Sequence, residues 1–173
     1  GAEFIIVYPH WGIEYQMTEA SWQREIAQKL CDMGVDAIIG GHPHVIEPVD
    51  VFTSEDGTHK TFCAFSLGNQ LSNQRREMMR LKTGNTEDGL FIDLEITRNK
   101  KGDVSLTGVK YIPTWVYKNA SGPTYSIVPV DDPSTVEEKT GIKGIQAQAQ
   151  ASYDRTYKII GDGVNKVSEA YGF

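Results

Sequence analysis

Three histidines follow two apolar runs of the sequence. His10 comes just after residues 4–8, whereas His42 and His44 flank a proline just after residues 35–39. Neutral imidazole is a common metal ligand, and zinc lies about 2.0–2.1 Å from its nitrogen. One His after a strand usually makes a structural hydrogen bond. Two such groups at the ends of two apolar runs favour a metal or anion site.

The elements that must position these histidines form a strand, a helix and a second strand. The segment between the runs shows apolar residues at helical spacing, which we interpret as the core-facing stripe of an amphipathic helix: Trp22, Ile26, Leu30 and Met33. Thr18 is the expected N-cap, Glu19 suits the positive helix end, and Gly34 suits the C′ position.

This order of elements predicts a right-handed crossover between parallel strands. Neighbouring strands lie about 5 Å apart, and ligands bind at their carboxyl ends in open α/β sheets. We therefore expect His10 and His42 to lie close enough to reach a common ion. Gly40 and Gly41 are expected to allow a tight turn before His42.

Beyond His44 the pattern changes to shorter alternating runs. Extended segments and turns predict antiparallel strands at 45–52, 60–66, 89–97 and 104–112. The remaining residues predict a tail that is first extended and then helical, at 145–160 and 164–170, and that packs back onto the main domain. The prediction is an α/β fold with one unit at 1–117 and an extension at 118–173.

Composition narrows the class of protein. The chain has 173 residues and 39% hydrophobic content, which suffices for one core. Its formal net charge of −6 argues against a general binder of nucleic acid or anionic membranes. No apolar run approaches the length of a membrane span. Cys31 and Cys63 suit small buried apolar positions. A disulfide between them requires the helix to pack over the strand that carries Cys63.

Three motifs of this chain resemble one family. The segments His-Trp-Gly-Ile-Glu-Tyr at 10–15, Gly-His-Pro-His-Val at 41–45 and Ser-Leu-Gly-Asn at 66–69 resemble the bacterial capsule-synthesis family CapA, also called the poly-γ-glutamate capsule biosynthesis family. The resemblance extends over about residues 3–117. It implies the C-terminal half of a metallophosphoesterase-like α/β sandwich, in which a βαβ unit leads into antiparallel strands.

The resemblance implies roles for four residues. His10 and His42 would share one divalent ion (Mn, Zn or Fe), and His44 would bind a second one. Glu14 would be a further ligand, a general base or an orienting residue, or it caps the following loop. We take His42 and Glu14 as the catalytic candidates. Two such ions can polarise a phosphoryl oxygen and supply a hydroxide.

One departure from the superfamily pattern is informative. Its upstream motifs, Asp-x-His and Asn-His, occur nowhere in this sequence. We therefore expect the chain to be the C-terminal portion of a longer protein. That protein's missing N-terminal portion would complete the metal site, so the isolated chain is expected to be a weak catalyst. The family also implies a cell-surface or extracellular location through an N-terminal membrane anchor.

Substrate contacts are predicted for three further residues. Asn69 follows a strand and is a candidate to bind substrate, or else a turn residue held by its own amide. Arg75 and Arg76 belong to the only concentrated basic run, which suits a phosphoester or an anionic polymer such as poly-γ-glutamate. Such a run is also typical of a solvated helix face. His59, beside the turn at 54–57, is expected to be solvated.

Two functions remain open from the sequence. The first is a metal-dependent phosphoesterase or hydrolase domain in capsule biosynthesis. The second is a non-catalytic component of polymer binding, export or anchoring that keeps the fold without turnover.

Overall fold

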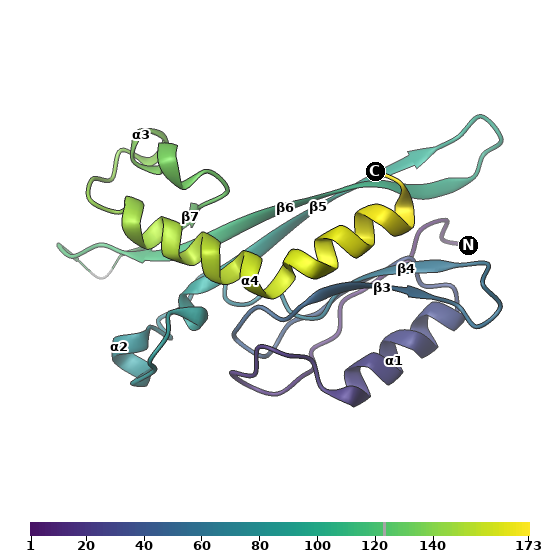
Figure 1. Ribbon diagram of the computed structural model, residues 1–173, viewed down its shortest axis with the longest axis horizontal. Helices are drawn as coiled ribbons and strands as arrows, with labels where there is room; N and C mark the ends of the chain where they lie inside the picture. The colour runs from purple at the N-terminus through teal and green to yellow at the C-terminus, as the bar shows by residue number, and fades with distance from the viewer. Residues whose placement is uncertain (123) are drawn as a thin grey trace.

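A computed structural model describes residues 1–122 and 124–173 of the chain. Two sheets and one long helix make up most of it (Figure 1). The first sheet has the strand order β1-β2-β4-β3. Its strands are β1 (Ile6–Val7), β2 (Ala37–Ile39), β3 (Val49–Thr53) and β4 (Lys60–Ala64).

The pairing in this sheet confirms the predicted parallel strands with a helix between them. β1 pairs with β2 in parallel, and helix α1 (Ser21–Asp32) connects them. β4 lies parallel on the other side of β2, and β3 closes the sheet as an antiparallel neighbour of β4. The carboxyl ends of β1 and β2 therefore meet at one edge, as expected for parallel strands.

The predicted phase of α1 is wrong by one residue. The helix buries Gln23, Ala27 and Cys31, whereas Trp22 and Ile26 are 40% and 41% exposed. Both stripes have the same spacing, so periodicity cannot choose between them. The small Ala27 and Cys31 allow the helix to approach the sheet closely, and Met33 is left 77% exposed.

Gln23 supplies the polar reason for this phase. Its side-chain oxygen accepts a hydrogen bond from the Ala20 amide, and its nitrogen donates to Glu47 Oε2 at 2.9 Å. The N-cap is Ala20 and not Thr18, because the Gln23 side chain satisfies the backbone amide at the helix start. Gly34, at φ 85°, follows the C-cap as predicted.

The second sheet is antiparallel, in the order β5-β6-β7. Its strands are β5 (Asp88–Arg98), β6 (Val104–Lys118) and β7 (Tyr125–Pro129). The predicted hairpin is confirmed. β5 is one residue longer at each end than predicted, and β6 continues six residues beyond its predicted end at 112. Short helical elements flank this sheet: α2 (Arg76–Met79), η1 (Asn85–Glu87), η2 (Pro133–Thr135) and α3 (Val136–Thr140).

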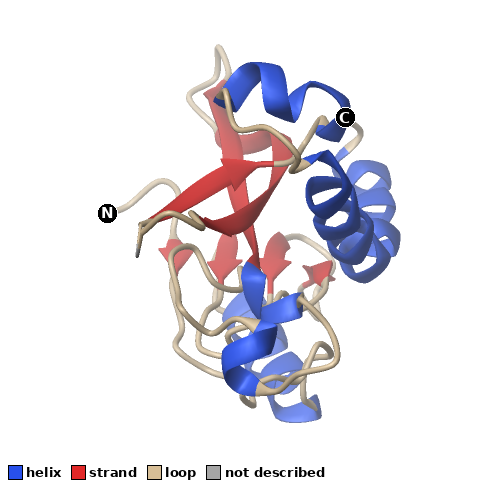
Figure 2. Cartoon of the chain, turned by 90° about the vertical axis from the view of Figure 1, so that its left-hand side faces the viewer, coloured by secondary structure: helices blue, strands red, loops and turns tan. Residues whose placement is uncertain are grey.

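The C-terminal tail ends in one helix, α4 (Gln146–Tyr171), where two were predicted. Gly161 and Gly163 lie between the two predicted segments. In the structure, α4 instead packs against β3 and β6. A Cβ on Gly163 would lie 1.8 Å from the Val49 carbonyl oxygen, so this glycine permits close contact within a continuous helix. The predicted packing of the tail onto the rest of the molecule is confirmed (Figure 2). The division at 117/118 stays a prediction.

The main core lies between the two sheets and α4. It includes Phe62 from β4, Leu90 from β5 and Ile160 from α4. A second apolar cluster lies under α1 and contains Trp11, Cys31, Cys63 and Phe65. Both cysteines are buried and free, as the apolar interpretation expects. Within the described residues, the structure has no helix with the length and apolar character needed to cross a membrane.

Candidate functional site

The carboxyl ends of β1 and β2 bring two of the predicted histidines together. His10 and Gly41 form a parallel bridge that continues the pairing of the two strands. The His10 and His42 rings follow, with centroids 4.5 Å apart and planes tilted by 49°. The predicted proximity of these two side chains is confirmed.

His44 lies at the outer side of this pair. Its ring centroid is 6.2 Å from that of His42 and 6.0 Å from that of Tyr15, on which it stacks at 24°. Glu14 Oε1 lies 3.9 Å from His44 Nε2. Both Glu14 and His44 are accessible to solvent, so an incoming group can reach the space between them.

The backbone at this edge adopts unusual conformations at residues that carry side chains. His42, His44 and Tyr15 have φ of 113°, 61° and 64°. Such values cost of order 1–3 kcal/mol per residue and occur often at functional sites. The expected tight turn at Gly40 and Gly41 is wrong, because neither has a positive φ.

Gly40 is needed for a different reason. A Cβ there would lie 2.0 Å from the Phe65 carbonyl oxygen and 2.5 Å from Trp11 Nε1. That same indole nitrogen donates to the Phe65 carbonyl at 2.8 Å. The chain after β2 therefore passes directly over the buried Trp11. This contact sets the distance between the core and the loop that carries His42 and His44.

Three backbone hydrogen bonds join the two histidine-bearing segments. Gly41 N donates to the Pro9 carbonyl at 3.1 Å, Trp11 N donates to the Gly41 carbonyl at 3.0 Å, and Tyr15 N donates to the Pro43 carbonyl at 2.8 Å. The last of these bonds requires Tyr15 to face the His-Pro-His segment. Tyr15 was missed in the sequence, although it lies inside the His-Trp-Gly-Ile-Glu-Tyr motif.

A buried carboxyl group lies beneath these loops. Glu47 is fully buried, and burial raises its pKa to about 7 despite the hydrogen bond from Gln23. Its Oε1 has no hydrogen-bond partner within the described chain. A Cβ on Gly12 would lie 3.4 Å from that oxygen and 2.7 Å from Pro43 Cγ, so the two loops close over the acid. A carboxylate within the apolar run 45–49 was the available sequence signal.

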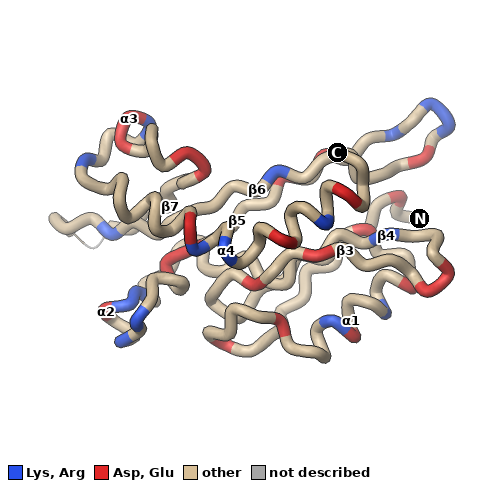
Figure 3. Tube along the Cα trace, viewed as in Figure 1, with Lys and Arg blue, Asp and Glu red and all other residues tan. Residues whose placement is uncertain are grey.

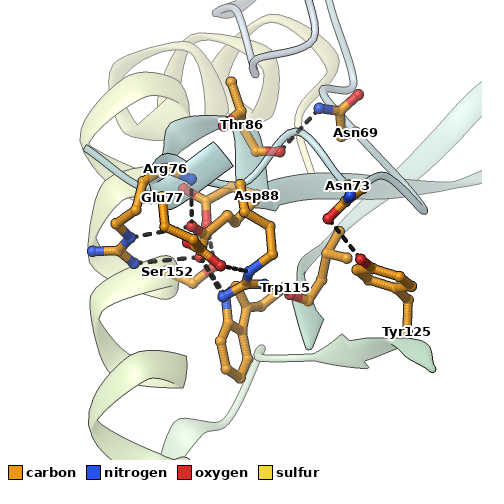
Figure 4. Close-up of polar contacts among 12 residues, drawn as sticks. Asn69, Asn73, Arg76, Glu77, Thr86, Asp88, Trp115, Tyr125 and Ser152 are labelled. Atoms are coloured by element: carbon orange, nitrogen blue, oxygen red, sulfur yellow. Dashed lines mark hydrogen bonds and ion pairs between the residues drawn. The ribbon is translucent and has the colours of Figure 1, made fainter. Parts of the chain in front are cut away.

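Asn69 is largely buried, and its predicted contact with substrate stays a prediction. It is 8% exposed and contacts His44 through both its amide nitrogen and its amide oxygen. Its nitrogen also donates to the Thr86 carbonyl at 2.9 Å (Figure 4). The structure therefore places Asn69 behind His44.

Arg75 and Arg76 are located apart from the histidines, in a polar network around Glu87. Arg76 Nε lies 3.1 Å from Glu87 Oε1, and Arg75 Nη2 lies 3.4 Å from Glu87 Oε2. Burial raises the pKa of Glu87, but hydrogen bonds from Arg76 and Trp115 outweigh it and hold that pKa below its usual range. Figure 4 shows Arg76, Asp88 and Trp115 of this network.

A neighbouring ion pair fixes α4 to the start of β5. Arg155 donates two hydrogen bonds of 2.7 Å to Asp88, and Ser152 donates a third. Asp88 is 2% exposed, and burial raises the pKa of its carboxyl despite the arginine. The network is therefore largely internal and structural, although Arg76 keeps an exposed edge.

A basic cavity opens beside this network. Its volume is about 480 Å³, and its lining includes Arg75, Arg76, Lys118 and Lys143 together with Trp115 and Tyr117. Figure 3 shows other basic residues around α2 as well. Within the described residues, neither Lys118 nor Lys143 forms an ion pair with a carboxylate.

The metal-ligand set is incomplete within this chain. Nowhere in residues 1–122 and 124–173 do three or more His, Cys, Asp or Glu side chains gather closely enough to hold a metal ion. The His10–His42 pair provides two nitrogens, and further ligands would have to come from elsewhere. His59, expected to be solvated, instead has its ring against the Val35 carbonyl at 2.9 Å and is only partly exposed.

Comparison with known proteins shows that the segment with these histidines is similar to one family. Residues 1–74 match the family model described as bacterial capsule synthesis protein PGA_cap. Residues 1–74 are therefore similar to the CapA capsule-synthesis family. The matched residues include all three site histidines, Glu14 and Asn69, whereas Arg75 and Arg76 lie just outside them.

Two CapA proteins are also similar to part of this chain. The chain is 31% identical over 108 residues to the PGA biosynthesis protein CapA of Bacillus subtilis (strain 168), covering 62% of this chain and 25% of that protein. It is 34% identical over 73 residues to the capsule biosynthesis protein CapA of Bacillus anthracis, covering 42% and 16%. The chain thus spans about a quarter or less of the length of these relatives.

Proposed function

We propose that this chain is the part of a capsule biosynthesis protein that supplies histidine ligands to a divalent metal site with hydrolase-like chemistry. The observation that supports it best is the 4.5 Å separation of the His10 and His42 rings at the ends of neighbouring parallel strands. The strained backbone of His42 and His44 and the nearby Glu14 add to it.

The proposed roles follow from the chemistry of each side chain. His10 and His42 hold one ion of manganese, zinc or iron, and His44 serves a second. A bound divalent ion supplies a Lewis acid that polarises a phosphoryl or carbonyl oxygen. Glu14 has an exposed carboxylate beside His44, where it can accept a proton from an attacking water.

The remaining ligands would come from a further part of the same protein. β1 pairs with β2 on one side, and no strand of the described chain lies on its other side. Ile6 in β1 and Tyr8 just after it are 50% and 69% exposed. Trp22 and Ile26 of α1 are also exposed, at 40% and 41%. An unpaired strand edge and apolar surface are suited to docking another strand. In this proposal the whole protein acts at the cell surface, as the family resemblance implies.

Metal content of the full-length protein tests the proposal. We expect near-stoichiometric manganese, zinc or iron by elemental mass spectrometry, and we expect its loss in the His42→Ala/His44→Ala variant. His59→Ala is the matched control, since His59 lies on the Val35 carbonyl and should leave the metal in place. Absence of metal from the wild type after reconstitution would contradict the proposal.

A second function is supported by the basic cavity beside α2. In this alternative the fold binds an anionic polymer such as poly-γ-glutamate without turnover. The chain is acidic overall, yet four cations line this cavity, and Arg75 and Arg76 are partly neutralised by Glu87. Lys118 and Lys143 would therefore carry most of the attraction for carboxylates.

Polymer titration of this chain tests the second function. We expect Lys118→Ala/Lys143→Ala to weaken poly-γ-glutamate binding at least tenfold at low salt, since two cations are removed. Lys100→Ala/Lys101→Ala, at the exposed tip of the β5–β6 hairpin, is the charge-matched control. Equal weakening in both variants would show only a non-specific charge effect.

A further inference from the structure

We propose that Asn69 is a positioning residue that fixes the tautomer of His44. It holds the neutral imidazole with its proton on Nδ1, so that the Nε2 lone pair faces the side of Glu14. The inference deepens the proposed metal site, and its consequence for metal affinity rests on that proposal. The tautomer of His44 does not depend on the proposed metal site.

The orientation of the Asn69 amide follows from its surroundings. Nδ2 lies 3.1 Å from the His44 carbonyl and 2.9 Å from the Thr86 carbonyl. Backbone carbonyls can only accept hydrogen bonds, so the group facing both of them must be the NH₂. Gln74 Oε1 lies 3.0 Å from the same nitrogen, so the two hydrogens of the NH₂ are shared among three nearby acceptors.

This orientation leaves one choice for the imidazole. The amide oxygen Oδ1 lies 3.1 Å from His44 Nδ1. An amide oxygen can only accept, so Nδ1 must carry the hydrogen, and in the neutral ring Nε2 then has none. Asn69 is 8% exposed, which limits the access of water that could replace this bond.

Tyr15 restrains the ring from the other side. Its side chain stacks on His44, and Gln74 Nε2 lies 3.4 Å from its hydroxyl. Rotating the imidazole by 180° would place a C–H group against Asn69 Oδ1 and lose the hydrogen bond. The ring is therefore fixed by stacking and by the amide together.

The fixed tautomer matters for what can bind beside it. A lone pair on Nε2 and the Glu14 carboxylate, 3.9 Å apart, are both acceptors. A divalent cation or a proton satisfies both of them. Hydrogen bonds of this kind to a ligating His commonly raise metal affinity about 10–100-fold.

The other histidines provide internal references. His59 has the opposite arrangement, because its Nε2 lies 2.9 Å from the Val35 carbonyl and must donate there. No ring hydrogen bond to His10 or His42 is present among the residues that the structure describes. The four histidines of the sequence therefore include one Nδ1–H form, one Nε2–H form and two without such a restraint.

Long-range ¹H–¹⁵N correlation NMR of this chain, with ¹⁵N-labelled histidine and without added metal, tests the inference. At alkaline pH, where imidazoles are neutral, we expect protonated Nδ1 in His44 and protonated Nε2 in His59. Protonated Nε2 in wild-type His44 would overturn the proposal without any variant. This spectrum needs no metal, so it is independent of whether the metal site exists.

Variants then assign the cause to Asn69. In Asn69→Ala we expect His44 to lose its single tautomer, whereas the His59 pattern stays the same. Asn73→Ala is the matched control, since Asn73 is exposed and accepts from the Tyr125 hydroxyl. A retained Nδ1–H form in folded Asn69→Ala would overturn the positioning role. If that variant does not fold, the wild-type spectrum still decides the tautomer.

Metal affinity of the full-length protein is the second measurement. We expect Asn69→Ala to weaken Zn²⁺ or Mn²⁺ binding about 10–100-fold and Asn73→Ala to leave it unchanged. Unchanged affinity in folded Asn69→Ala would overturn the proposed effect on the metal. Failure of the wild type to bind metal would instead contradict the proposed function and leave the tautomer result standing.

Discussion

Two polar regions of this molecule differ in how many of their polar side chains have hydrogen-bond or ion-pair partners. At the Glu87–Asp88 network, buried carboxylates meet arginines, an indole and a serine, and α4 covers them. At the His10–His42–His44 edge, the rings are accessible, and the described residues supply hydrogen bonds to only one of them. A satisfied buried network stabilises the fold, whereas unsatisfied accessible ligands are available for binding.

The accessible histidine-bearing edge of the sheet nonetheless depends on buried side chains beneath it. Trp11, which follows His10, is 6% exposed, stacks on Phe65 and donates to the Phe65 carbonyl. We expect Trp11→Ala to cost about 3–5 kcal/mol in urea unfolding. Trp22→Ala is the control, and we expect about 1 kcal/mol because that side chain is 40% exposed. Equal losses would show that α1 packs in the phase first expected from the sequence.

Breaking the closed network should cost stability and leave the site unchanged. Asp88→Ala leaves Arg155 without its carboxylate, and we expect a loss of about 3 kcal/mol in urea unfolding. Asp93→Ala, in an exposed position of the same strand, should cost less than about 0.5 kcal/mol. A change in the His44 tautomer in Asp88→Ala would show that the two regions are coupled.

Glu47 is intermediate between the two regions. It is buried, and only one of its two carboxyl oxygens has a hydrogen-bond partner among the described residues. Its pKa in the folded state, about 7, lies above its ordinary value, so the folded state binds more protons between about pH 4.5 and 7. Stability from this group is present at low pH and is lost as pH rises through 7.

Glu47→Gln removes this pH dependence. At pH 8 we expect the variant to be more stable than the wild type by on the order of 2 kcal/mol, with a much smaller difference at pH 4. Urea unfolding at both pH values measures this. Glu55→Gln, an exposed carboxyl, is the control. A constant difference between Glu47→Gln and wild type across pH would contradict the raised pKa.

The smallest effect is expected at the open edge itself. His42→Ala should change the free energy of unfolding by less than about 0.5 kcal/mol, since a site ligand at a strand end contributes little to the core. His42→Gly should stabilise the apo chain by about 1 kcal/mol, because glycine relieves the φ of 113°. Unfolding of the chain in either variant would mean that His42 is structural, which would weaken the proposed metal role.

The sequence was sufficient for the local elements and for part of the site. Strand, helix and strand followed from apolar periodicity, and the parallel pairing expected for such a unit placed His10 beside His42. The β5–β6 hairpin followed from alternation and its turn residues. These features depend on neighbours in the chain or on a general rule for strand–helix–strand units, so one sequence contains enough information.

Only the tertiary structure decided which face of α1 is buried, which glycines require their small size, and what each polar group contacts. Trp22 and Gln23 are adjacent, and the choice between their stripes depends on Glu47, 24 residues away from Gln23. Asn69 meets His44 across 25 residues, and Asp88 meets Arg155 across 67. Such pairings depend on how distant segments pack, which periodicity and spacing along the chain do not encode.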